Sequence, residues 1–347
     1  MRDSRHSTNR SFHISLAVIT SLSGIAVFLA KYIDPSKFPV FSLIPPIAPF
    51  ILFFTLALTL YFIWKRNWLL IVLTITILLN TESVASYLKV FSKKESAPVN
   101  KELSLIVVTY NIHEFKSLTY SNIISDIPDY LAGVGADVIC IQEYEDFPMS
   151  SDQEKEKAFS EYPHKFILKK SSGENGLAIF SRLPIQETGI IDFKESANGA
   201  IWANVLFSGK STRILNVHMQ TTGYSFTKNK NPLLIARVML ASNRIRSEQA
   251  KVVRKFCDST KVPLIVCGDF NDPQESYVYR TVKGRLKDTF LEGGTGSGIS
   301  LRGVFSFLRI DFILSSEDFE CNQSYYDKVI FSDHYPLIAE LEYQNRK

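Results

Sequence analysis

The sequence predicts a mixed α/β (α+β) domain with a core of two β-sheets and helices on the outside, preceded by a membrane region. Three observations support this prediction. Long apolar runs fill the first 91 residues, short β-branched runs alternate with helical stretches in the remainder, and polar side chains recur where those runs end. A sheet buries one face against another sheet or against helices, so strands of this kind need a layered core.

The N-terminal region, residues 1–91, is predicted to hold three transmembrane helices. They are expected over residues 12–32, 40–64 and 68–91, because a helix crosses the bilayer core with about 20 apolar residues. The third is the weakest, since Glu82 follows the end of its uninterrupted apolar run at Leu79. The alternative is two spans with a re-entrant or interfacial third segment. A cleaved signal peptide explains the first run only.

Basic residues give the expected orientation. Arg2, Arg5 and Arg10 precede the first span and Lys65-Arg66 follows the second. Both groups favour the cytoplasm and agree with each other, whereas lysines in the first loop and after the third span oppose them. We therefore expect a multi-pass protein of the cell membrane, in contact with the lipid bilayer, whose C-terminal domain lies outside the cytoplasm.

A polar, proline-containing segment at residues 92–100 is predicted to be a linker to a domain spanning 101–347. The formal net charge of +4 is too small to indicate nucleic-acid binding. The four cysteines include no Cys-x-x-Cys pair, which argues against a zinc or thioredoxin-type site. Cys140 and Cys267 lie inside apolar runs, and we expect them in the core.

The elements of this domain follow in chain order. A β-branched apolar run predicts a buried strand over 103–110, and a periodic apolar pattern predicts a helix over 123–131. The next strand is expected over 137–142. A long amphipathic helix is predicted over 233–257, with its charged residues on one face. The remaining strands are expected over 165–168, 176–181, 201–207, 213–218, 263–267, 310–314 and 336–341.

Polar residues stand at the ends of these predicted strands. If the strand ends converge, they form one acidic, amide-rich cleft that contains histidine. Oxygen ligands of this kind suit Mg²⁺ or Mn²⁺, with water completing the coordination shell. The residues in question are Asn111, Gln142, Glu143, His218, Asp269, Asn271, Asp311, Asp333 and His334.

Six short motifs in this order resemble those of the endonuclease/exonuclease/phosphatase superfamily. These are Mg²⁺-dependent phosphodiesterases that include DNase I-like nucleases, neutral sphingomyelinases and inositol polyphosphate 5-phosphatases. The resemblance covers about residues 103–342 and implies a DNase I-like fold, a four-layer sandwich of two packed mixed sheets flanked by helices. The motifs are Thr109-Tyr110-Asn111, Ile141-Gln142-Glu143, Asn216-Val217-His218, Gly268-Asp269-Phe270-Asn271, Arg309-Ile310-Asp311-Phe312-Ile313 and Ser332-Asp333-His334-Tyr335-Pro336.

The resemblance also implies roles for the polar residues. Glu143 is similar to the principal metal ligand, with Asn111 nearby, and Asp333 contributes to the metal site directly or through water. His218 and Asn271 resemble groups that bind the scissile phosphate. The catalytic residues implied are His218, Asp269, which orients or deprotonates the attacking water, and Asp311, which pairs with His334.

His113 departs from the pattern of some nucleases in the superfamily, which carry an acid two positions after the asparagine. The sequence leaves open whether His113 is a site residue or a loop residue. The function expected is a membrane-anchored, metal-dependent phosphodiesterase or phosphatase acting on a phosphoester such as a lipid head group. The alternatives are a membrane-tethered nuclease acting on nucleic acid and a non-catalytic scaffold that keeps the fold. No obligate protein partner is evident.

Overall fold

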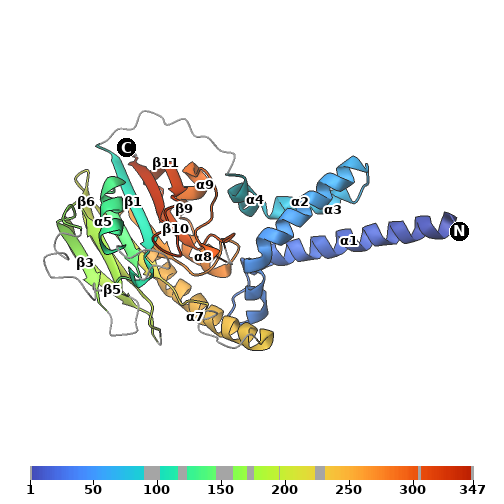
Figure 1. Ribbon diagram of the computed structural model, residues 1–347, viewed down its shortest axis with the longest axis horizontal. Coiled ribbons are helices and arrows are strands. Elements are labelled where there is room, and N and C mark those ends of the chain that lie inside the picture. The colour runs from blue at the N-terminus through green and yellow to red at the C-terminus, as the bar shows by residue number, and fades with distance from the viewer. Residues whose placement is uncertain are drawn as a thin grey trace.

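The computed structural model describes residues 2–89, 102–115, 123–145, 159–169, 176–194, 196–222, 231–303 and 306–344. Helices extend from one side of an α/β domain, and the two parts touch through α4 and α7 (Figure 1). The predicted linker at 92–100 lies outside the described residues, and the domain boundaries stay a prediction.

The N-terminal helices are α1 (Arg2–Ala30), α2 (Ala48–Trp64), α3 (Leu70–Leu79) and α4 (Thr81–Leu88), with short 3₁₀ helices η1 (Pro39–Leu43) and η2 (Pro45–Ile47) before α2. Two helical stretches, Arg10–Ala30 and Pro39–Trp64, are long and apolar enough to cross a membrane. Large apolar side chains on these helices face outward, with Phe53 exposed by 74% and Leu60 by 59%. Such surfaces suit a lipid environment.

The third apolar segment is bent. α3 and the helical stretch Thr81–Tyr87 meet at 82°. The bend lies at Asn80, whose buried amide donates to the carbonyls of Gly24 and Thr76, each at 3.0 Å. The segment predicted as one span over 68–91 is therefore two helices, and it counts as a third crossing only if the bent pair acts as one span.

The α/β domain contains two six-stranded sheets. Their strand orders are β11-β12-β1-β2-β4-β3 and β5-β6-β7-β8-β10-β9. The first sheet comprises β1 (Ser104–Asn111), β2 (Val138–Gln142), β3 (His164–Leu168), β4 (Leu177–Ser181), β11 (Phe319–Tyr326) and β12 (Leu337–Tyr343). The second comprises β5 (Ile185–Asp192), β6 (Gly199–Phe207), β7 (Lys210–His218), β8 (Leu264–Asp269), β9 (Lys287–Asp288) and β10 (Asp311–Ser315).

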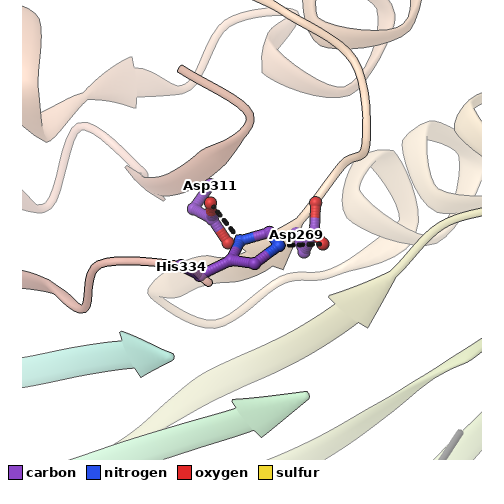
Figure 2. A group of neighbouring side chains, drawn as sticks. All are labelled: Asp269, Asp311 and His334. Atoms are coloured by element: carbon purple, nitrogen blue, oxygen red, sulfur yellow. Dashed lines mark hydrogen bonds and ion pairs between the residues drawn. The ribbon is translucent and has the colours of Figure 1, made fainter. Parts of the chain in front are cut away.

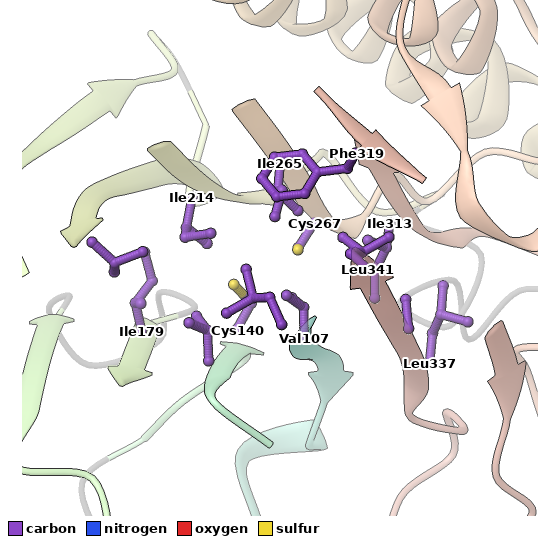
Figure 3. Packing of buried hydrophobic residues seen from close by; sticks show 14 of the residues in the cluster. Val107, Cys140, Ile179, Ile214, Ile265, Cys267, Ile313, Phe319, Leu337 and Leu341 are labelled. Carbon is purple, nitrogen blue, oxygen red and sulfur yellow. The ribbon is translucent and has the colours of Figure 1, made fainter. Parts of the chain in front are cut away.

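The main core lies between the two sheets. Val107 and Cys140 of the first sheet pack with Ile265 and Cys267 of the second (Figure 3). Neighbouring residues point the other way, and Val108 belongs to a separate outer cluster. Because both faces of the central strands are buried, these strands are continuous apolar runs in the sequence.

Helices cover the outer faces of the sheets. α5 (Ile123–Gly133) packs Ile127 and Leu131 against the first sheet. α7 (Pro232–Ser259) and α8 (Tyr277–Lys283) cover the second, and the 3₁₀ helix η4 (His113–Phe115) and the short α9 (Thr289–Gly293) complete the domain. The predicted four-layer, two-sheet fold is confirmed. Strands β5, β9 and β11 were not predicted.

Candidate active site

Strand register brings the predicted polar residues to one edge of the two sheets. β1 and β2 run parallel, with Asn111 opposite Gln142. β7 and β8 are also parallel, and His218 lies opposite Asp269. β10 is antiparallel to β8 and begins where β8 ends, so Asp311 also pairs with Asp269. The carboxyl ends of four strands and the start of a fifth therefore meet.

A histidine between two aspartates forms the centre of this cluster (Figure 2). His334 Nδ1 lies 2.9 Å from Asp311 Oδ2, and His334 Nε2 lies 3.8 Å from Asp269 Oδ2. All three residues are buried, and one ligand atom of each lies within 4.8 Å of the others. Removing ionised groups from water is costly, and here opposite charges and hydrogen bonds offset that cost.

A second group of side chains connects this centre to Glu143. Asn111 Nδ2 donates to Glu143 Oε1 and to Asp269 Oδ2, both at 3.1 Å. The fully buried His218 approaches the same carboxylates, with its Nε2 3.6 Å from Glu143 Oε1 and 3.8 Å from Asp269 Oδ2. Asn111, Glu143, His218 and Asp269 thus form one contiguous network around a small volume.

The turn after β8 positions Asn271. Its backbone N–H donates to Asp269 Oδ1 at 2.7 Å, and its Nδ2 donates to the Met219 carbonyl at 3.0 Å and to Asp269 Oδ2 at 3.2 Å. Gly268 allows this strand to pass close to β7, because a Cβ at that position would lie 1.9 Å from the Val217 carbonyl oxygen. Its φ of +143° also favours glycine.

Several site residues adopt a left-handed backbone. Positive φ angles occur at His113 (49°), Glu143 (54°) and Asn271 (53°). Non-glycine residues rarely hold this conformation, and such strain persists where the surrounding structure imposes it. The same conformation occurs away from the site at Arg66, Phe159 and Ser208, so it helps to position the site side chains but does not by itself mark a functional residue.

The remaining predicted residue, Asp333, lies at the outer margin with a side chain 37% exposed. His113 connects it to the network, since its Nδ1 lies 3.5 Å from Glu143 Oε2 and 3.7 Å from Asp333 Oδ1. The sequence left open whether His113 is a site residue or a loop residue. The structure places it within the site. The eight residues to which the resemblance gives catalytic, phosphate-binding or metal-binding roles lie together at this sheet edge. Their roles stay predictions.

The sequence did not indicate the contacts that support this arrangement. Ser332 Oγ donates to the Asn111 carbonyl at 2.8 Å and accepts from the His334 N–H at 3.2 Å. Tyr326 donates to the Asp311 carbonyl at 2.6 Å. Beneath the site, Gln142 donates to Asn216 Oδ1 at 2.6 Å and joins the two sheets. Gln142 was among the predicted cleft residues, and Asn216 and Ser332 lie in the predicted motifs, whereas Tyr326 carried no signal in the sequence.

The carboxylates of the site differ in their pKa. Burial, followed by repulsion from Asp311, raises the pKa of Asp269 to about 7. Burial would also raise the pKa of Glu143, but the His113 hydrogen bond, His218 and the Asn111 amide together lower it to about 2. For His334, burial acts to lower the pKa, and attraction to Asp311 and Asp269 outweighs it and raises the pKa well above its usual value. Different environments thus separate an ionised Glu143 from a proton-accepting Asp269.

The donors fit a hard divalent cation. Glu143 and Asp269 offer carboxylate oxygens on either side of the Asn111 amide, and Asp333 adds a partly exposed carboxylate at the outer margin. Asn111 presents its Nδ2 to the carboxylates while its Oδ1 accepts from the His113 N–H at 3.1 Å. Coordination through Asn111 Oδ1 therefore requires the amide to rotate.

Comparison with known proteins identifies the family of this chain. The model of the endonuclease/exonuclease/phosphatase family matches residues 108–334, more than half of the chain. The chain belongs to this family. Its members are phosphoester hydrolases, generally dependent on divalent metal ions. A second model, a domain of unknown function, matches residues 9–87. The search of curated proteins returned no match.

Solved structures of this family share the fold at low sequence identity. An endonuclease/exonuclease/phosphatase from Bacteroides vulgatus superposes with a TM-score of 0.54 and 19% identity, covering 70% of this chain and 99% of that one. A humanized TDP2 of D. rerio gives 0.53 and 18%, covering 69% and 99%. The human Nocturnin catalytic domain gives 0.52 and 15%, covering 72% and 98%. These likenesses concern the fold alone.

Proposed function

We propose that this protein is a membrane-anchored, Mg²⁺- or Mn²⁺-dependent phosphoester hydrolase whose substrate is a phosphoester at the membrane surface, such as a lipid head group. The observation that supports it most is the buried histidine–aspartate centre, joined through Asn111 to an ionised Glu143 at one sheet edge. Family membership supports phosphoester hydrolysis, and the apolar N-terminal helices support anchoring.

Each residue has a role in this proposal. Glu143, Asn111 and Asp333 hold the metal ion, which when bound neutralises charge on the phosphoester. His218 and Asn271 donate to the phosphate oxygens, where negative charge grows during attack. Asp269, with its raised pKa, accepts a proton from the attacking water.

His334 supplies the complementary function. Asp311 orients its ring and favours its protonated form, so the imidazolium can stabilise charge or donate a proton to the leaving oxygen. Asp269 and His334 lie within 3.8 Å of each other, which lets a base and an acid act on the same phosphorus centre.

The contacts between helices and domain support a topology with three crossings. Ser42, in the segment between α1 and α2, contacts Asn243 of the α/β domain. The domain therefore lies on the side of that segment, opposite the N-terminus and Lys65-Arg66. Returning to this side after α2 requires the α3–α4 pair to cross. With the basic N-terminus in the cytoplasm, the active site faces outside. Protease treatment of intact cells tests this, and cleavage of the domain only after permeabilisation would contradict it.

A substrate panel tests the activity. The full chain in lipid nanodiscs is assayed with phospholipid, oligonucleotide and a small chromogenic phosphodiester, each with Mg²⁺ and with EDTA. We expect Mg²⁺-dependent release from the lipid that is lost in Glu143→Gln. Preference for the oligonucleotide would favour the tethered nuclease, and no metal-dependent turnover of any ester would favour the scaffold.

A further inference from the structure

The first ten residues of α7, Pro232 to Ala241, are apolar with one exception, Arg237. None of the ten is buried, and Leu233 and Leu234 are exposed by 72% and 37%. A helix that is apolar around its whole circumference is normally buried in a core or in lipid. This end of α7, termed here the α7 arm, is only partly covered by the described residues, since five of its ten residues are exposed and five are half-buried.

Two contacts define the direction of α7 relative to the predicted membrane helices. Asn243 Nδ2 donates to Ser42 Oγ at 2.8 Å, and Lys251 Nζ lies 2.7 Å from Asp34 Oδ2. Ser42 and Asp34 both belong to the short segment that joins α1 to α2, which lies at one face of the membrane. Their partners are eight residues apart on α7, about 12 Å along the helix. α7 thus passes alongside the segment between α1 and α2, oblique to α1 (Figure 1).

α7 touches the rim of the active site through Arg246, five residues after the end of the α7 arm. Arg246 Nη1 donates to the Gln220 carbonyl at 2.9 Å and to the Asn271 carbonyl. The arm continues N-terminally from this point, beyond the sheet edge that carries the site. A further contact between the N-terminal helices and the α/β domain joins Phe50, in the first turn of α2, to Phe307, with ring centroids 4.7 Å apart.

From these relations we propose that the α7 arm inserts its apolar side chains into the interfacial layer of the bilayer and holds the active-site mouth against the lipid head groups. The proposal rests on the membrane anchoring proposed above. Lipid is the occupant that fits, because the arm continues an existing contact with the membrane-side segment. Two exposed arginines, Arg237 in the arm and Arg244 just after it, can reach lipid phosphates.

Fluorescence on the full chain tests the insertion directly. An environment-sensitive dye is attached at Leu234→Cys in vesicles of phosphatidylcholine and phosphatidylglycerol, and spin-labelled lipid serves as quencher. The matched control is Ile190→Cys, which is 53% exposed on the edge strand β5. The four native cysteines are buried. We expect blue-shifted emission and lipid quenching at 234 only. Equal quenching at both positions overturns the proposal. So does a blue shift at 234 that depends on protein concentration and not on lipid.

Activity supplies an independent measurement. In the double variant Leu233→Glu/Leu234→Glu, turnover of phospholipid should fall by about tenfold or more, because burial of one leucine favours association by at least that factor. Turnover of a soluble phosphodiester should match that of Ile190→Glu. Equal loss on both substrates overturns the proposal. If lipid quenches the dye at 234 but the protein hydrolyses no ester, the membrane insertion of the α7 arm is supported and the proposed enzyme function is wrong.

Discussion

His334 and Asp311 form a buried pair in which Nδ1 lies 2.9 Å from Oδ2. The carboxylate fixes the ring so that its second nitrogen, Nε2, faces Asp269. Attraction to both aspartates raises the pKa of His334 although burial opposes it. The raised pKa favours the cationic ring, and the proposed hydrolysis therefore assigns His334 the part of an acid or a charge stabiliser rather than a base.

Replacing Asp311 should remove this cation. In Asp311→Asn the larger of the two attractions is lost, so the pKa of His334 falls, and the ring loses the hydrogen bond that orients it. We expect kcat to fall by about 10²- to 10⁴-fold at saturating Mg²⁺, the range typical of lost general acid catalysis. Asp192→Asn, exposed at the end of β5, is the control and should leave kcat unchanged. A loss of less than about threefold in Asp311→Asn would show that the pair does not take part in the chemistry.

Glu143→Gln should act on metal binding. The surroundings of Glu143 hold its carboxylate in the charged form, with a pKa of about 2, and a neutral amide is a weaker ligand for Mg²⁺ or Mn²⁺. We expect the Mn²⁺ dissociation constant, measured by electron paramagnetic resonance, to rise by more than about tenfold. Glu145→Gln, two residues along and exposed, should bind Mn²⁺ as the unmodified protein does. Equal affinities in both variants would place the ion elsewhere.

The strand ends of the site could be predicted because chemistry-bearing residues follow continuous apolar runs. Such runs indicate strands buried on both faces, and parallel neighbours such as β1 and β2 bring Asn111 and Gln142 to one edge. The edge strand β5 escaped prediction because most of its residues are exposed, so no apolar run marks it. β11 escaped because small polar residues such as Ser324 occupy buried positions.

The supporting contacts were unpredictable for a different reason. Ser332 and Tyr326 are common residue types whose role depends on loops that fold back onto Asn111 and Asp311. His113 was undecided because its contact with Glu143 depends on a left-handed backbone at both residues. Tertiary structure decides such contacts, and no local pattern in the sequence records them.

The raised pKa of Asp269 predicts the acid side of the pH profile. A base must be unprotonated, so kcat/KM should fall as pH decreases through about 7. A bound cation favours the carboxylate, so higher Mg²⁺ should move this limb to lower pH. Measuring the profile at two Mg²⁺ concentrations checks both statements. A rate independent of pH between 5 and 8 would exclude Asp269 as the base.

The raised pKa of Asp269 also affects the stability of the metal-free protein. The folded-state pKa of about 7 exceeds the unfolded value of about 3.9. Between these values the folded state binds more protons, so the free energy of unfolding decreases as pH rises from about 4 to 7. Asp269→Asn lacks this contribution. Thermal unfolding across that range should show a steeper decline for the unmodified protein than for the variant, and parallel curves would contradict the assignment.

A buried ion pair beside the site should matter more for stability than for catalysis. Arg309 donates to both carboxylate oxygens of Asp288, at 3.0 and 2.8 Å, with side chains 3% and 1% exposed. Asp288→Asn leaves the guanidinium buried without a counter-charge, and breaking such a pair costs about 3–5 kcal/mol. The exposed pair Arg182–Glu161 gives the control, since Glu161→Gln should cost less than about 1 kcal/mol. Chemical unfolding of the full chain in detergent measures both. Similar losses in the two variants would mean that Gln274, whose Oε1 accepts from Arg309 at 2.6 Å, is enough to hold the buried charge.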